Sequence, residues 1–160
     1  MFCYQCEQTA KGTGCTSFGV CGKDPEVAAL QDLLVHLTGQ IGQLAHRARK
    51  WGATDREVDL FVVEALFTTV TNVNFDPARM EGMLRRGFEV KATARKLYED
   101  AAARAGAPVE ELRCTLPKEP VLDLNALVRL GEKVSPEADI ERYGDTVAGR
   151  LVSVLEGGYD

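Results

Sequence analysis

The chain has 160 residues, of which 45% are hydrophobic and 27% are charged. These values are typical of one soluble globular domain with room for an appendage, and they argue against disorder. The formal net charge of −5 argues against a nucleic-acid-binding protein, which needs clustered Lys and Arg residues to contact phosphates. The one basic cluster, Arg47-Ala48-Arg49-Lys50, falls where a helix is expected to end and complements the helix dipole there.

No apolar run approaches the roughly 20 residues that a membrane-spanning helix needs, so we expect no membrane association. The first residues, Met-Phe-Cys-Tyr-Gln-Cys-Glu, contain neither a basic segment nor an apolar core. We therefore expect no signal peptide and a cytoplasmic location. In a reducing cytosol, clustered cysteines are metal ligands or catalytic groups more often than they are disulfides.

Residues 1–24 are expected to form an irregular loop, because glycines interrupt them and no hydrophobic period emerges. Asp24-Pro25 then predicts a helix start, with a capping residue followed by proline at the first helical position. Gly52 is expected to end this segment as a left-handed cap. Between them, apolar residues recur at steps of three and four, which predicts one buried helix face. They are Val27, Leu30, Leu34, Leu37, Ile41, Leu44 and Ala48.

A second helix is predicted to start at Thr54-Asp55-Arg56-Glu57, which matches a capping box. Its body, residues 60–67, is apolar nearly all round, which predicts burial at the centre of the fold. The β-branched residues of 70–75 are compatible with a strand, but we favour a helix end followed by an Asn-rich turn. Two roles are open for that turn, residues 71–74. It caps the flanking helices, or it packs under the loop of residues 1–24, the cysteine loop, and donates N–H groups to the sulfurs of that loop.

Asp76-Pro77 repeats the helix-start signal, and an apolar stripe then continues to Gly106. Its members are Met80, Leu84, Gly87, Ala94, Tyr98, Ala101 and Ala105. Three successive helices with short connections predict an up-down-up bundle over residues 25–106.

Residues 107–122 contain Pro108, Pro117 and Pro120, which predicts an extended connection. A short helix is expected at 124–133 and a last one near 139–155. Two helices do not complete a bundle, so residues 107–160 are predicted to be a partial second unit. The predicted fold is therefore all-α, with a Gly-rich loop at 1–24, a three-helix bundle at 25–106 and this incomplete unit.

Four of the five cysteines, Cys3, Cys6, Cys15 and Cys21, fall within nineteen residues as C-x2-C-x8-C-x5-C. A C-x2-C pair lets two thiolates converge on one metal or cluster edge, and the glycines permit the turns that bring the others round. A structural zinc site normally shows two such pairs, and disulfides fit poorly with a cytosolic chain. The spacing therefore favours an iron–sulfur cluster, while zinc and disulfides remain open as alternatives.

Three segments together resemble the hybrid cluster protein family, also called prismane proteins or hydroxylamine reductases. They are FCYQCEQTAKGTGCTSFGVCGK at 2–23, LQDLL at 30–34 and LFTTVTNVNFD at 66–76, and the resemblance spans roughly residues 1–105. It implies that Cys3, Cys6, Cys15 and Cys21 are the ligands of a conventional cluster. Family members with this compact spacing resemble those that carry a 4Fe–4S cubane. A 2Fe–2S cluster, found with wider spacing, is the alternative.

The resemblance also implies a function in electron transfer. In the family, hydroxylamine reduction and reaction with nitric oxide occur at a second, hybrid cluster, bound by a His, two Glu and several Cys from later in a longer chain. None of those motifs is present in these 160 residues, so no catalytic residue is predicted. Whether the chain is an enzyme by itself is left open. The expected partners are an electron-donor protein and a second chain, or a missing C-terminal region, that carries the hybrid cluster. A fragment, a split-enzyme subunit and a short homologue all fit.

Two functions from other classes stay open. One is a metal-stabilised helical module for protein association without enzymatic activity. The other is a sensor that responds to oxygen or nitric oxide by losing its cluster, which would require a protein partner because no DNA-binding surface is evident.

Five further side chains have the chemistry to contribute to the site. Cys114 matches no family ligand and is interpreted as incidental. His36 and His46 lie about 80° apart around one helix and cannot readily share a metal. Lys11 and Lys23 could offset the negative charge of a cluster, but solvated lysines are the commoner outcome.

Overall fold

The computed structural model describes residues 3, 14–70, 75–112, 116–117, 120–121 and 123–135. Its helices are α1 (Pro25–Arg49), α2 (Arg56–Val70), α3 (Pro77–Ala105) and α4 (Leu124–Lys133). Apart from one isolated bridge between Cys3 and Cys15, all regular structure in these residues is helical, which confirms the all-α prediction. The predicted turn at 71–74 and the predicted helix at 139–155 lie outside the described residues, and the division into three units stays a prediction.

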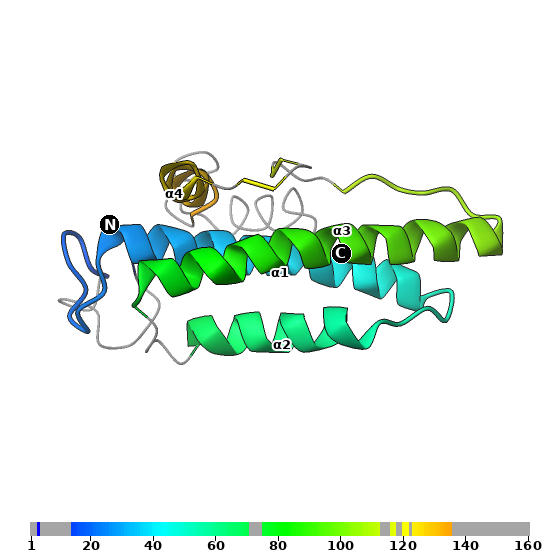
Figure 1. The fold of residues 1–160 in the computed structure, drawn as a ribbon, viewed down its shortest axis with the longest axis horizontal. Helices are drawn as coiled ribbons and strands as arrows, with labels where there is room; N and C mark the ends of the chain where they lie inside the picture. The colour runs from blue at the N-terminus through cyan, green and yellow to red at the C-terminus, as the bar shows by residue number, and fades with distance from the viewer. Residues whose placement is uncertain are drawn as a thin grey trace.

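The helix α1 lies at the centre and contacts each of the other three helices. Its predicted stripe is confirmed, since all seven side chains from Val27 to Ala48 are fully buried. The helices α1, α2 and α3 run side by side along the long axis of the molecule (Figure 1). Gly87 of α3 lies where they meet: a Cβ atom there would come within 2.7 Å of Leu37 Cδ2 and 3.0 Å of Phe61 Cζ. Burial of apolar surface along α1 is therefore what holds the bundle together.

Aspartate side chains start the helices. Asp24 Oδ1 accepts a hydrogen bond of 2.7 Å from the N–H of Val27, and Asp76 Oδ1 accepts one of 3.0 Å from Ala78. The predicted capping box at the second helix is wrong in its capping residue. Asp55, not Thr54, accepts from the Val58 N–H at 3.1 Å, because α2 begins one residue later than the box requires. A carboxylate at this position also interacts favourably with the positive end of the helix dipole.

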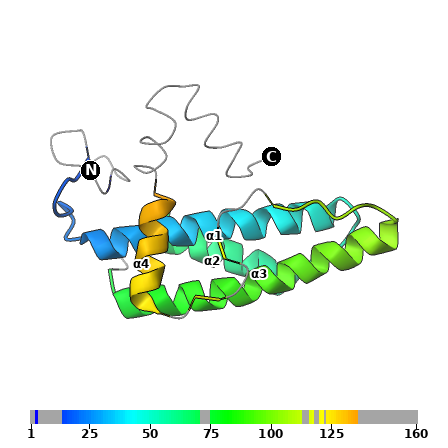
Figure 2. The ribbon, with the colours of Figure 1, turned by 90° about the horizontal axis from the view of Figure 1, so that it is seen from above.

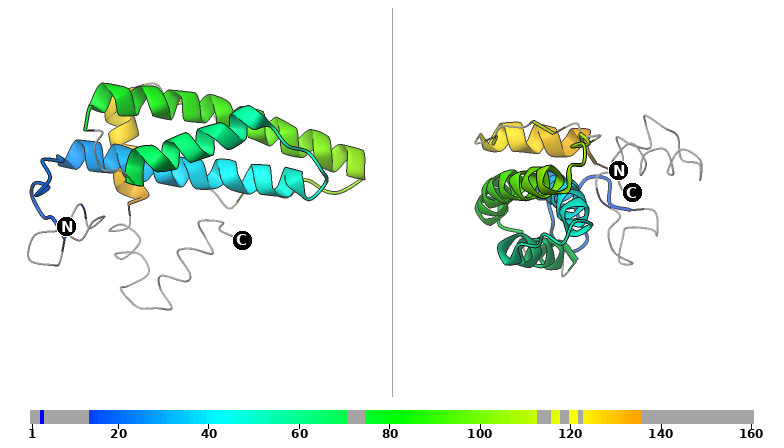
Figure 3. Two further views of the ribbon diagram at one scale, coloured as in Figure 1. Left: turned by 90° about the horizontal axis from the view of Figure 1, so that it is seen from below. Right: turned by 90° about the vertical axis from the view of Figure 1, so that its right-hand side faces the viewer.

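The prediction that the second helix is buried at the centre is wrong. Val58, Phe61 and Ala65 of α2 are buried, but Val63 and Phe67 on the outer face are each 67% exposed. The reason is the arrangement of the layers: α4 lies on the opposite side of α1 and α3 from α2 (Figures 1 and 3). Although it is apolar nearly all round, α2 therefore lies at the edge of the bundle. Among the described residues, its outer face is exposed.

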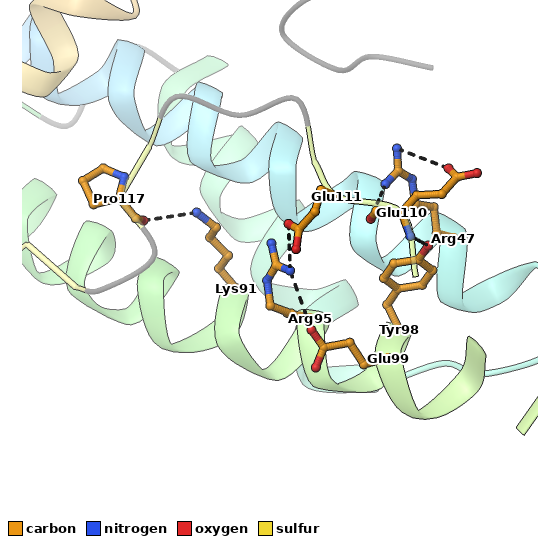
Figure 4. A network of polar contacts seen from close by, with 8 residues as sticks. All are labelled: Arg47, Lys91, Arg95, Tyr98, Glu99, Glu110, Glu111 and Pro117. Carbon is orange, nitrogen blue, oxygen red and sulfur yellow. Dashed lines mark hydrogen bonds and ion pairs between the residues drawn. The ribbon is translucent and has the colours of Figure 1, made fainter. Parts of the chain in front are cut away.

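The connection after α3 runs back along the bundle and is tied to it by polar contacts (Figure 4). The N–H of Glu110 donates to Tyr98 Oη at 2.8 Å, and Arg47 Nη1 of α1 donates to the Glu110 carbonyl at 3.2 Å. Further along, the buried Lys91 donates to the Pro117 carbonyl at 3.4 Å. These contacts hold the described part of the connection against α1 and α3, and its extended conformation stays a prediction.

The helix α4 lies across α1 and α3 (Figure 2). The crossing is close because Gly131 has no side chain: a Cβ atom at this position would overlap the backbone carbonyl of Ala29 in α1. Leu127, one turn earlier, is fully buried in the same contact region. A glycine is therefore required at 131 for space, not for its backbone conformation.

We predict that Gly131→Ala destabilises the fold by about 1–3 kcal/mol, because the added methyl group must push two helix backbones apart. The matched control is Gly82→Ala in α3, where a Cβ atom would meet nothing within 4 Å. That change should instead stabilise the chain by up to about 1 kcal/mol through helix propensity. Urea unfolding followed by circular dichroism measures both, and equal stabilities for the two variants would contradict the close crossing.

Candidate metal centre

Two of the predicted ligands are neighbours on paired backbone segments. Cys15 N donates to the Cys3 carbonyl at 2.6 Å, and Cys3 N donates to the Cys15 carbonyl at 3.4 Å, as in an antiparallel bridge. Opposite residues of such a pair have Cα atoms about 5.5 Å apart. Cys15 is 5% exposed, Cys3 is half-buried, and neither forms a disulfide. The two thiol groups are thus outside any disulfide and start from adjacent points of the chain.

Glycines shape the loop around these cysteines. Gly14, directly before Cys15, has φ +101°, and Gly22, directly after Cys21, has φ +94°, both in a region that favours glycine. Gly19 N donates to the Lys23 carbonyl at 2.7 Å, and Gly22 N donates to the Gly19 carbonyl at 2.9 Å. These bonds close a tight turn over 19–23. Glycine turns are thus present at these positions, and the convergence of the four thiolates stays a prediction.

The described residues contain only part of the predicted ligand set. Cys21 is exposed on the 19–23 turn, and Cys6 lies outside the described residues, as does Cys114. Within the described ranges, no three His, Cys, Asp or Glu side chains come together as a metal site would require. His36 is half-buried and His46 is exposed. The structure therefore brings Cys3 and Cys15 together and leaves the assignment of all four ligands a prediction.

Lys23 is the residue that sequence reasoning misjudged. The expectation of a solvated lysine is wrong, since Lys23 is only 1% exposed. Its Nζ lies 4.0 Å from Cys3 Sγ and 5.8 Å from the centroid of the Phe75 ring. The signal in the sequence was its place between a candidate ligand, Cys21, and the α1 cap at Asp24, where the backbone has little freedom. Lys11 lies outside the described residues.

A carboxyl group on α1 completes this charged cluster. Burial raises the pKa of Asp32 to about 7, although the nearby ammonium of Lys23 acts to lower it. A half-buried carboxyl and a buried ammonium thus interact beside the cysteine loop, and each reduces the cost of burying the other.

The chemistry of these groups fits a metal or cluster held by thiolates. Thiolate ligands bring negative charge, and a desolvated ammonium beside Cys3 Sγ offsets it. Glycines with positive φ stand directly before Cys15 and directly after Cys21, and they permit the tight backbone turns that a cluster loop needs. The residues present are therefore suitable for the cluster that the resemblance implies.

A groove of about 350 Å³ lies elsewhere, between α1 and α2. It is lined from Val35 to Arg47 on α1 and by Val62 and Leu66 on α2. The cysteine loop lies at the other end of α1, before its first residue, Pro25. The groove therefore does not contribute to the candidate metal centre.

We predict that Asp32 titrates near pH 7 in the folded, metal-free chain and near the ordinary value of about 3.9 when unfolded. Between these pH values the folded state holds a proton that the unfolded state has lost, so stability should fall as the pH rises from about 4 to about 7. Carboxyl-carbon NMR measures the titration directly. Lys23→Met should raise the pKa of Asp32 further, whereas Lys50→Met at the exposed end of α1 should leave it unchanged. A pKa of Asp32 that stays near 3.9 would contradict its burial.

The chain matches the family model described as the Prismane/CO dehydrogenase family over residues 1–134. The hydroxylamine reductase of Acidithiobacillus ferrooxidans is 42% identical over 161 residues, which cover 98% of this chain and 29% of that protein. The hydroxylamine reductase of Geobacter sulfurreducens is 55% identical over 101 residues, 63% of this chain and 18% of the relative. That of Methanocella arvoryzae is 45% identical over 140 residues, 88% of this chain and 25% of the relative.

The chain thus spans less than a third of the length of these relatives. The matched region includes the cysteine loop, all four helices and the connection between α3 and α4. The resemblance of the cysteine loop and the two later segments to the hybrid cluster protein family is confirmed by these matches. The chain belongs to the Prismane/CO dehydrogenase family.

Proposed function

We propose that Cys3, Cys6, Cys15 and Cys21 bind an iron–sulfur cluster and that the chain transfers single electrons. The cluster is a 4Fe–4S cubane, the donor is a soluble electron-transfer protein of the cytoplasm, and the acceptor is a hybrid-cluster centre outside these residues. The observation that carries the proposal is the pairing of Cys3 with Cys15 in a chain of this family.

The residues of the chain have separate tasks in this function. Cys3 and Cys15 present two sulfurs from paired backbone, and the 19–23 turn carries Cys21 on a short, closed loop. Asp24 fixes the start of α1 directly behind that turn, so the loop has a rigid support. When bound, the cluster supplies a one-electron redox couple. The protein keeps the couple at a fixed place and excludes water from Cys15.

The proposed coupling to hydroxylamine reduction rests on the relatives of the chain. The relatives that the chain matches are hydroxylamine reductases, and the chain spans only part of their length. Electron relay to a hybrid cluster is consistent with a region that offers thiolates but no catalytic residues of its own. Among the described residues, no helix combines the length and the apolar character needed to cross a bilayer.

We predict that the anaerobically purified chain contains about four iron and four sulfide per polypeptide, with the electron paramagnetic resonance signal of a reduced cubane after dithionite treatment. Cys15→Ser should lose most of the iron, because it removes one of the paired sulfurs. Cys114→Ser is the matched control and should retain it. One zinc per chain without sulfide would exclude the electron-transfer function and leave a metal-stabilised interaction module.

We also predict that the iron-loaded chain has no hydroxylamine reductase activity by itself. The reason is that the ligands of the hybrid cluster, as the family has them, are not among these residues. Reduced viologen supplies electrons in the assay, and its oxidation with and without hydroxylamine reports turnover. Hydroxylamine-dependent oxidation above that of a chain without iron would contradict the relay function and place a catalytic centre in this chain.

A further inference from the structure

A buried ammonium group lies beside the cysteine loop. Lys23 is among the largest fully buried side chains of the described residues. Removing an ammonium from water is costly unless negative charge or hydrogen-bond acceptors surround it. The protein accepts this cost at a position two residues after a candidate ligand, which points to a role for the charge.

The surroundings of Lys23 come from three parts of the chain. Cys3 of the N-terminal segment places its Sγ at 4.0 Å from Nζ. Asp32 of α1 interacts electrostatically with the ammonium. Phe75, directly before α3, offers the face of its ring with the centroid 5.8 Å away, a favourable arrangement for a cation. The ammonium is therefore enclosed by groups that stabilise positive charge.

The backbone leaves Lys23 little freedom to leave this position. Its carbonyl accepts from Gly19 N at 2.7 Å, and the following residue, Asp24, caps α1. A Cβ atom at Gly19 would come within 2.9 Å of the Lys23 carbonyl oxygen and 3.1 Å of its Cβ atom. The turn thus packs directly against Lys23, and the side chain is directed from a fixed base towards Cys3.

We propose that Lys23 is a positioning residue that raises the reduction potential of the cluster by holding a fixed positive charge against the sulfur of Cys3. The inference rests on the proposed function, because it needs a cluster at the four cysteines. One electron passes from the donor protein to the cluster, and no proton moves to or from Lys23. The added negative charge is stabilised by the ammonium, which is already in place and desolvated before the electron arrives. Asp32 and Phe75 keep the ammonium there.

The test is a redox titration of the reconstituted chain, followed by electron paramagnetic resonance, in three variants beside the wild type. Lys23→Met keeps the length and removes the charge. Lys23→Arg keeps the charge. Lys50→Met removes one charge from the exposed end of α1 and is the matched control for net charge. Iron content and circular dichroism are measured on the same samples.

At a fixed solution potential, Lys23→Met should lower the ratio of reduced to oxidised cluster about tenfold, the effect of losing one nearby charge in a partly screened site. For a one-electron couple this is a shift of about 59 mV. Lys23→Arg and Lys50→Met should stay close to the wild type. Loss of the cluster in Lys23→Met with full retention in Lys23→Arg would support the same role, since charge would then be required even for binding.

Two results would overturn the inference. One is an iron-loaded Lys23→Met with the wild-type potential, which would reduce Lys23 to a space-filling side chain and leave the electron-transfer function intact. The other is loss of the cluster in both Lys23 variants, which would show that the size and packing of the side chain, rather than its charge, determine whether the cluster is retained. A wild-type chain without iron and sulfide would instead refute the proposed function, so the two failures are distinguishable.

Discussion

The enclosure of α1 is the constraint on which the rest of the structure depends. Its apolar stripe packs against α2 and α3, while Ala29 on another side lies directly beneath Gly131 of α4. A helix covered on several sides has a fixed position, and so does whatever is joined to its first residue. The cysteine loop ends at Asp24, the cap of α1, and therefore takes its orientation from the most buried element of the protein.

Electrostatics link this scaffold to the candidate metal centre. Asp32 lies on α1, two turns after the cap, and Lys23 lies immediately before it. Burial of Lys23 beside Cys3 is costly because the ammonium loses its hydration, and the electrostatic interaction with Asp32 offsets part of that cost. Negative charge from thiolate ligands would add to the groups that already stabilise the ammonium, which are Cys3, Asp32 and Phe75.

The two outer layers of the fold differ in how they are completed. On one side, α4 and the connection tied down by Tyr98 and Arg47 cover α1 and α3. On the other side, α2 presents Leu60, Val63 and Phe67 at its surface. Among the described residues these three side chains are each more than half exposed, and the chain spans less than a third of the length of its relatives.

The sequence by itself determined what depends on local rules: the helix starts at Asp24 and Asp76, the stripe of α1, the short helix at 124–133 and the candidate ligands with their family. Capping and periodicity are properties of neighbouring residues, and they can be read along the chain. Only the tertiary structure decided that α2 is an edge helix, that Lys23 is buried against Cys3 and that Gly131 gives α4 its close approach to α1. Burial depends on which distant segments cover a residue. An apolar helix and a lysine in a glycine-rich loop have the same local pattern whether or not something covers them.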